Sequence, residues 1–188
     1  MFTCLLCGKS VKTYGEFFCL SCSFSFGEFS FRQADGVLSL FPYKTEMRSL
    51  VLQAKAGACL RTLLCLVQIF RAHSESRRIC VAADFVLPAP SSLFSRMRGS
   101  FDVAWFLAES LSSSCALKLM TTPFSLHFSL KKRAKLDRKG ESFDLMPFLE
   151  IDPKKPTLLI VDDVLTTGFT LRKLCSYYQK DYNLKLLT

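Results

Sequence analysis

One stretch of the sequence, residues 158–171 (LLIVDDVLTTGFTL), limits the possible folds more than any other. It begins with a continuous apolar run, which is typical of a central strand in a parallel sheet that is buried on both faces. Two aspartates follow at once, and in open α/β sheets ligands bind beyond the carboxyl ends of the strands. The stretch therefore predicts a buried parallel strand over Leu158–Val161 that ends at a ligand site.

The residues after this strand combine two kinds of ligand-binding group. The ionised carboxylates of Asp162 and Asp163 only accept hydrogen bonds, so an adjacent pair suits neighbouring hydroxyl donors or a metal ion. Hydroxyl groups and a glycine follow shortly after them, in Thr166, Thr167, Gly168 and Thr170. Hydroxyls and backbone N–H groups at the start of a helix form a favourable site for a phosphate, and glycine lets the backbone approach closely. Together these groups predict a ribose 5-phosphate as the ligand.

The same stretch is open to two other interpretations. An apolar strand that ends in aspartate is also found in P-loop nucleotide hydrolases, where the aspartate holds Mg²⁺. Those proteins need a GxxxxGK[ST] loop, and the sequence contains neither this loop nor a GxGxxG loop. Alternatively, Asp163 and the threonines only cap a helix. Capping accounts for one or two of these residues, and it leaves the adjacent acids together with the TTGxT turn unexplained.

The remaining apolar patterns alternate between strand and helix. Strands are expected at residues 36–43, 79–87, 115–120, 158–161 and 184–187, and helices at 45–72, 101–111 and 170–179. Gly57 is expected to divide or bend the first helical segment. This alternation predicts an α/β fold with a mostly parallel sheet flanked by helices.

Four of the nine cysteines form two CxxC pairs near the amino terminus: Cys4, Cys7, Cys19 and Cys22. A single CxxC pair is also found in redox proteins or arises by chance, but two pairs at this separation favour a structural Zn²⁺ site with four thiolate ligands. An odd number of cysteines without a secretory signal argues against a disulfide framework. We therefore expect a small zinc-binding module over residues 1–30 and an α/β domain over residues 31–188.

Charge and hydropathy limit the partners. The net charge of +9 favours anionic partners such as phosphorylated metabolites or nucleic acid, and 49% apolar residues are sufficient for a packed core. Residues 131–139 (KKRAKLDRK) concentrate the basic charge, and they either contact a nucleic-acid backbone or form a solvated loop. Because no apolar run reaches the length of a membrane span and the first residues lack a signal-peptide pattern, a cytoplasmic location is expected.

The segment VDDVLTTGFT at residues 161–170 resembles the phosphoribosyl-pyrophosphate loop of type I phosphoribosyltransferases. With a Cys4 amino terminus in front of it, the whole chain resembles the competence-protein ComF family. The resemblance implies a type I phosphoribosyltransferase-like fold. It also implies that Asp162 and Asp163 bind the ribose hydroxyls, while the TTGxT turn holds the 5-phosphate.

The resemblance extends to two further segments. Residues 88–90 (PAP) are similar to a PVP turn at the strand end where the pyrophosphate would lie. Arg96, Arg98 and Gly99 resemble an arginine-rich RxRG turn, and guanidinium groups suit bidentate contact with phosphate. The interpretation of these arginines as a solvated loop face stays open. The chain departs from the family pattern in the next residues, which are Ser100-Phe101-Asp102 where Phe-Asn-Gln is usual.

Two hypotheses about function follow. The first is an enzyme that transfers ribose 5-phosphate from phosphoribosyl pyrophosphate to a nitrogen acceptor, with Mg²⁺ and cationic side chains stabilising the departing pyrophosphate. The second is a non-catalytic accessory of DNA uptake that binds single-stranded DNA through the zinc module and residues 131–139. Neither His73 nor His127 stands out as a general base, and the sequence leaves the acceptor and the oligomeric state open.

Overall fold

The computed structural model describes residues 2–12, 16–26, 32–34, 36–56, 59–91, 101–122 and 151–188. Several positions singled out above lie outside these ranges, namely Arg96, Arg98, Gly99, His127 and the basic segment 131–139. The expected boundary between the module and the domain also falls largely outside them. What was predicted for these positions stays a prediction.

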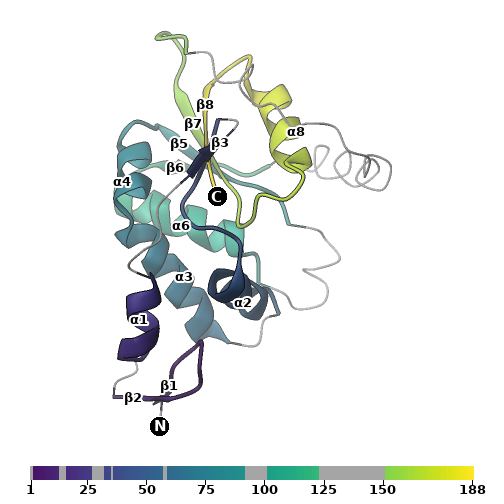
Figure 1. Ribbon diagram of the computed structural model, residues 1–188. Helices are drawn as coiled ribbons and strands as arrows, with labels where there is room; N and C mark the ends of the chain where they lie inside the picture. Colours follow the sequence, from purple (N-terminus) through teal and green to yellow (C-terminus); the bar gives the residue numbers. More distant parts are fainter. Residues whose placement is uncertain are drawn as a thin grey trace.

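A six-stranded sheet forms the centre of the chain (Figure 1). Its strands are β3 (Arg32–Ala34), β4 (Val37–Ser39), β5 (Phe85–Pro88), β6 (Lys118–Leu119), β7 (Thr157–Val161) and β8 (Asn183–Leu187). The strand order is β3-β4-β8-β7-β5-β6, and every neighbouring pair is parallel except β3 and β4. The prediction of an α/β fold with a mostly parallel sheet is confirmed.

Helices cover both faces of this sheet (Figure 1). The helices are α2 (Thr45–Lys55), α3 (Leu60–Ala72), α4 (Ser74–Val81) and α6 (Val103–Cys115) on one face, and α8 (Phe169–Tyr178) on the other. None of the described helices is long and apolar enough to cross a membrane.

The central strand β7 is buried on both faces, as its apolar run predicts. Leu159 and Val161 belong to the core beneath α2, α3, α4 and α6, whereas Leu158 and Ile160 belong to the core beneath α8. All four side chains have no exposed surface. Alternate side chains of a strand point to opposite faces, so β7 lies between two apolar layers. Both of its edges are paired in the sheet, with β5 on one side and β8 on the other.

The prediction of one strand over residues 79–87 is wrong in its first half. Residues up to Val81 belong to α4, and β5 begins only at Phe85. Helix α4 (SESRRICV) buries only Ser76 and Cys80, so its sequence carries no periodic apolar signal. A short helix with so small a buried face depends on tertiary packing rather than on its own pattern.

The strand predicted at residues 115–120 is also shorter than expected. Cys115 is the last residue of α6, and the strand β6 comprises only Lys118–Leu119. Between them Ala116 adopts a left-handed backbone conformation with φ of 56°, and its N–H donates to the carbonyl oxygen of Ser112. A left-handed residue of this kind commonly ends a helix.

Two differences concern the amino-terminal edge of the sheet. The strand predicted at 36–43 is limited to Val37–Ser39, and Pro42 lies beyond it, where the chain leaves the sheet. The antiparallel strand β3 was not predicted. The division of the segment 45–72 is confirmed, because α2 ends at Lys55 and α3 begins at Leu60.

The amino-terminal module packs at the end of α3 that lies away from the sheet (Figure 1). It consists of a short antiparallel pair, β1 (Phe2–Thr3) and β2 (Ser10–Val11), followed by α1 (Leu20–Phe26). These elements are too short to bury a core of their own. Their stability must therefore come from a bound metal or from contacts with the domain.

Candidate functional site

The four cysteines of the two CxxC pairs form one cluster. The sulfur atoms of Cys4, Cys7, Cys19 and Cys22 all lie within 4.8 Å of one another, and those of Cys7 and Cys19 are 3.6 Å apart. A tetrahedral zinc site with bonds of about 2.3 Å has sulfur atoms about 3.8 Å apart. The cluster therefore has the ligands and the spacing of a structural zinc site. In the part of the chain that the structure describes, no other set of three or more His, Cys, Asp or Glu side chains lies close enough to hold one metal ion.

Local backbone structure positions these thiols. The amide of Gly8 donates to the carbonyl oxygen of Cys4 at 3.0 Å, and the amide of Cys4 donates to the carbonyl oxygen of Lys9 at 2.7 Å. Gly8 has a φ of 73°, in the left-handed region that favours glycine. At the second pair, the amides of Cys22 and Ser23 both donate to the carbonyl oxygen of Cys19. Each pair is thus held by a turn that brings its two thiols to the same side.

The thiols differ in acidity. Burial alone would raise the pKa of Cys4, but hydrogen bonds from the backbone at Cys7, Cys19 and Leu6 lower the pKa to about 6. Burial and the neighbouring thiols raise the pKa of Cys22 to about 12. Four thiolates at this spacing repel one another, so full ionisation requires a bound cation.

Arg61 of α3 joins the module to the domain. Its guanidinium group donates hydrogen bonds to the carbonyl oxygens of Thr3 and Glu16, and it lies 5.7 Å from the centroid of the Phe17 ring. Only 9% of its surface is exposed. A buried guanidinium group needs acceptors of this kind. Nothing in the sequence singles out this arginine, because its partners lie in another part of the chain.

We expect Arg61→Met to loosen the module while the sheet stays folded. Loss of hydrogen bonds from a charged donor costs about 1.5–3 kcal/mol, so amide hydrogen exchange in residues 2–12 should become about 10- to 100-fold faster. Arg71→Met, an exposed position on the same helix, is the control. Equal exchange rates in the two variants would contradict the anchoring role of Arg61.

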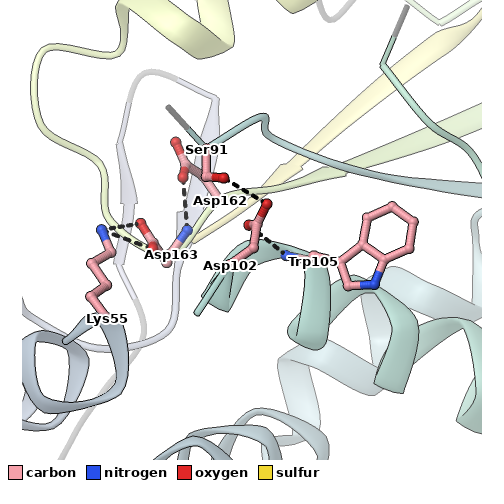
Figure 2. A network of polar contacts seen from close by, with 6 residues as sticks. All are labelled: Lys55, Ser91, Asp102, Trp105, Asp162 and Asp163. Atoms are coloured by element: carbon pink, nitrogen blue, oxygen red, sulfur yellow. Dashed lines mark hydrogen bonds and ion pairs between the residues drawn. The ribbon is translucent and has the colours of Figure 1, made fainter. Parts of the chain in front are cut away.

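The predicted acid pair lies at the carboxyl end of β7 (Figure 2). The carboxylate of Asp163 accepts from the ammonium group of Lys55, with Nζ 2.9 Å from Oδ1 and 2.8 Å from Oδ2. Lys55 is the last residue of α2. Oδ1 of Asp162 accepts from the backbone N–H of Asp163 at 2.8 Å. Asp163 is thus ion-paired with a lysine, whereas Asp162 accepts a hydrogen bond from the backbone.

A third carboxylate, that of Asp102, approaches this pair from the start of α6 (Figure 2). Its Oδ1 accepts from the backbone N–H of Trp105 at 3.2 Å, and its Oδ2 accepts from the hydroxyl of Ser91 at 2.8 Å. Asp102 therefore caps α6. It also holds the side chain of Ser91, the residue that follows the turn at 88–90. Asp102 therefore has a structural role, whatever ligand the pocket binds.

These side chains line one pocket, which we call the carboxylate pocket. It has a volume of about 250 Å³ and is lined by Lys55, Ala89, Pro90, Ser91, Phe101, Asp102, Val103, Ala104, Asp162 and Asp163. Lys55 is the only cation among these lining residues, and it is already paired with Asp163. A surface with three carboxylates accepts hydrogen bonds, so the described part of the pocket suits a polyol better than an anion.

The carboxyl group of Asp162 has a pKa above the ordinary value of an aspartate. Burial raises the pKa of Asp162 to about 7, and the negative charge of Asp163 adds to the increase. The backbone N–H of Asp163 and the charge of Lys55 act in the opposite direction. Near neutral pH Asp162 is therefore only partly ionised, and a ligand or cation that favours its charged form would complete the ionisation.

The raised pKa makes the stability of the free protein depend on pH. Between about pH 4 and about pH 7 the folded chain keeps a proton on Asp162 that the unfolded chain has released, so the unfolding free energy falls as the pH rises. One pKa unit corresponds to about 1.4 kcal/mol. Since Asp162 keeps some contact with solvent, we expect a loss of about 1–3 kcal/mol over this range.

Urea denaturation between pH 4.5 and pH 8 measures this effect. In Asp162→Asn the loss of stability with rising pH should disappear, whereas Asp181→Asn, at an exposed position, should retain it. The same pH dependence in both variants would show that Asp162 is not the responsible group.

The predicted TTGxT turn lies between this site and α8. Gly168 is buried and has a φ of 63°, a conformation that favours glycine, and α8 begins at the next residue. Thr166 and Thr167 are exposed, and Thr170 is half-buried in the first turn of α8. None of these residues is among those that line the carboxylate pocket. The structure thus brings Asp162 and Asp163 together in one pocket, whereas Thr166 and Thr167 are exposed residues outside its lining.

Three residues of the site were not predicted: Lys55, Ser91 and the capping carboxylate of Asp102. Lys55 is separated from Asp163 by 108 residues, and Ser91 from Asp102 by 11. A lysine at a helix end and a serine after a proline-rich turn are common in sequences of any function. The contacts that single them out exist only in the folded chain.

Comparison with protein-family models, with curated proteins and with solved structures found no match to this chain. Its function is therefore argued from the site itself, because one fold supports many functions.

Proposed function

We propose that this chain is a ComF-like protein with a type I phosphoribosyltransferase-like domain, and that it binds phosphoribosyl pyrophosphate at the carboxyl end of β7. The observation that carries the proposal is the pair Asp162 and Asp163, which follows a strand buried on both faces and precedes a glycine-led helix start. Ligands of open parallel sheets bind at this edge. Adjacent acceptors there match the two adjacent hydroxyls of a ribose.

The two parts of the site would share the ligand. Asp162 and Asp163 accept hydrogen bonds from the ribose hydroxyls in the carboxylate pocket. The backbone N–H groups at the start of α8, with the hydroxyls of Thr166 and Thr167, receive the 5-phosphate, because a helix amino terminus attracts anions. The exposure of these threonines leaves room for a phosphate group.

The pyrophosphate would lie near residues 88–90 and the ammonium group of Lys55, a residue that lines the pocket and whose side chain is 41% exposed. Arg96 and Arg98 are the further cations that the resemblance assigns to this group. Mg²⁺ prefers one or two carboxylates together with substrate phosphates, so it would enter the site with the pyrophosphate. These cations oppose the negative charge of the carboxylate pocket.

The reaction proposed for this site is a transfer to a nitrogen nucleophile. The lone pair of the nitrogen forms a bond to C1 of the ribose as the bond between C1 and the pyrophosphate oxygen breaks. Pyrophosphate leaves with that electron pair, and a proton from the nitrogen passes to solvent. Lys55 stabilises the negative charge that develops on the departing oxygen.

Calorimetric titration tests the ligand assignment. Phosphoribosyl pyrophosphate with MgCl₂ should bind with a stoichiometry of one, and ribose 5-phosphate should compete for the same site. Pyrophosphate alone should bind more weakly than either, because it lacks the hydroxyls that Asp162 and Asp163 recognise. Absence of binding by both sugar phosphates would refute the proposed function.

A further inference from the structure

A second pocket adjoins the carboxylate pocket, and we call it the apolar pocket. It has a volume of about 310 Å³ and shares Val103 and Asp163 with its neighbour. Most of its wall is apolar and comes from the segment before α2, from α2, α3 and α6, and from the residues after Asp163. The walls include Phe41, Tyr43, Met47, Phe70, Val164 and Leu165. The shared residues place this space directly beside the position proposed for the ribose.

Polar groups are few in the apolar pocket. Ser39 is the last residue of β4, and Thr188 directly follows β8. Their hydroxyls are joined by a hydrogen bond of 2.8 Å. Lys44 is exposed, and Asp163 is bound to Lys55. An ammonium ion or a small aliphatic amine would lose hydration here without gaining enough partners. A nucleobase with several exocyclic donors and acceptors would meet the same difficulty along the apolar walls.

The volume and the walls of the apolar pocket suit a ligand with a flat ring. A cavity of about 150 Å³ holds one benzene molecule, so the apolar pocket has room for a single substituted ring or for two fused rings. Phe41, Tyr43 and Phe70 supply aromatic surface that favours another ring in edge or offset contact. The Phe41 ring is itself fixed by an edge contact with His73, with centroids 5.4 Å apart. The pocket therefore has at least one aromatic wall that is held in place.

We propose that the apolar pocket binds the nitrogen acceptor, and that the acceptor is a weakly polar heteroaromatic compound of one or two rings. The proposal rests on the proposed function, because it places a ring nitrogen next to Asp163 and the ribose. The ring nitrogen gives its lone pair to C1 of the ribose as pyrophosphate leaves with the electrons of the broken bond. The ring N–H proton is released to solvent.

Benzimidazole is a suitable probe, because it is a flat two-ring compound with a nucleophilic nitrogen and one N–H donor. Saturation-transfer NMR and calorimetry should detect its binding to the wild-type chain. Uracil and ammonium chloride should bind at least tenfold more weakly. Equal or tighter binding of uracil would overturn the proposed acceptor class.

Variants on α2 locate the binding site. Val51→Phe fills the apolar pocket from its wall and should weaken benzimidazole binding at least tenfold, whereas Leu52→Phe, at an exposed position on the same helix, should leave it unchanged. Should Val51→Phe fail to fold, Tyr43→Ala at the exposed mouth serves instead and should weaken binding about fivefold. Unchanged affinity in the pocket variant overturns the proposal.

Ribose 5-phosphate binding separates this proposal from the one it rests on. Val51→Phe should bind ribose 5-phosphate as the wild type does, because Val51 does not line the carboxylate pocket. Binding of ribose 5-phosphate without any binding of benzimidazole would overturn the acceptor assignment alone. If the folded wild-type chain binds neither ribose 5-phosphate nor benzimidazole, both proposals are overturned together.

Discussion

The double variant Asp162→Asn, Asp163→Asn is expected to weaken ribose 5-phosphate binding by a factor of about 100 to 10,000. Each carboxylate that accepts a hydrogen bond from the sugar contributes about 1.5–3 kcal/mol as a charged acceptor, so the two together contribute about 3–6 kcal/mol, and every 1.4 kcal/mol corresponds to a tenfold change in affinity. The variant also leaves Lys55 without its partner. Calorimetric titration of the variant measures the loss directly.

The control for this experiment is Asp181→Asn, which removes an exposed carboxylate beyond the end of α8. It should bind ribose 5-phosphate as the wild type does. Circular dichroism should show both variants folded. Wild-type affinity in the double variant would mean that the sugar phosphate binds elsewhere on the chain.

Asp162→Asn is expected to stabilise the free protein, although it weakens ligand binding. Because burial and Asp163 disfavour the charged form of Asp162, an amide at this position should stabilise the free protein at pH 8. The same substitution should weaken ligand binding. Loss of function together with a gain in stability is typical of a residue that is retained for a ligand rather than for folding.

Removal of the metal is expected to unfold the amino-terminal module. Binding of a structural zinc ion by four thiolates contributes about 10–16 kcal/mol in small zinc domains, and the short elements of this module have no comparable source of stability. Cys4→Ser, which alters a cysteine with 3% exposed surface, should lose zinc. Amide exchange in residues 2–12 and 16–26 should then approach the rate of an unfolded chain.

The sheet should survive this change, because its two cores contain no residue of the module apart from partly buried contacts. Cys115→Ser is the control, since Cys115 lies in α6 and outside the thiol cluster. It should keep one zinc ion per chain, as measured by elemental analysis of protein purified without chelators. Well-folded wild-type protein with much less than one zinc per chain would exclude the metal site.

The strongest predictions came from segments whose pattern is local. The apolar run before Asp162 predicted the buried strand, and the spacing of the four cysteines predicted their cluster. The prediction failed for α4 and β3, where the sequence has too few apolar residues to show a period. Packing against the domain takes the place of intrinsic preference in α4, and β3 is a strand because it pairs with β4.

The sequence alone determined the ligand groups of two sites. These are the four thiols of the cysteine cluster and the two carboxylates at the end of a buried strand. Those features depend on residues close together in the chain, where backbone geometry leaves few alternatives. Only the tertiary structure decided what surrounds them. It pairs Lys55 with Asp163 across 108 residues, anchors the module through Arg61, and sets an apolar pocket beside the acid pair. Such contacts depend on strand order and helix packing, which no local pattern of residues records.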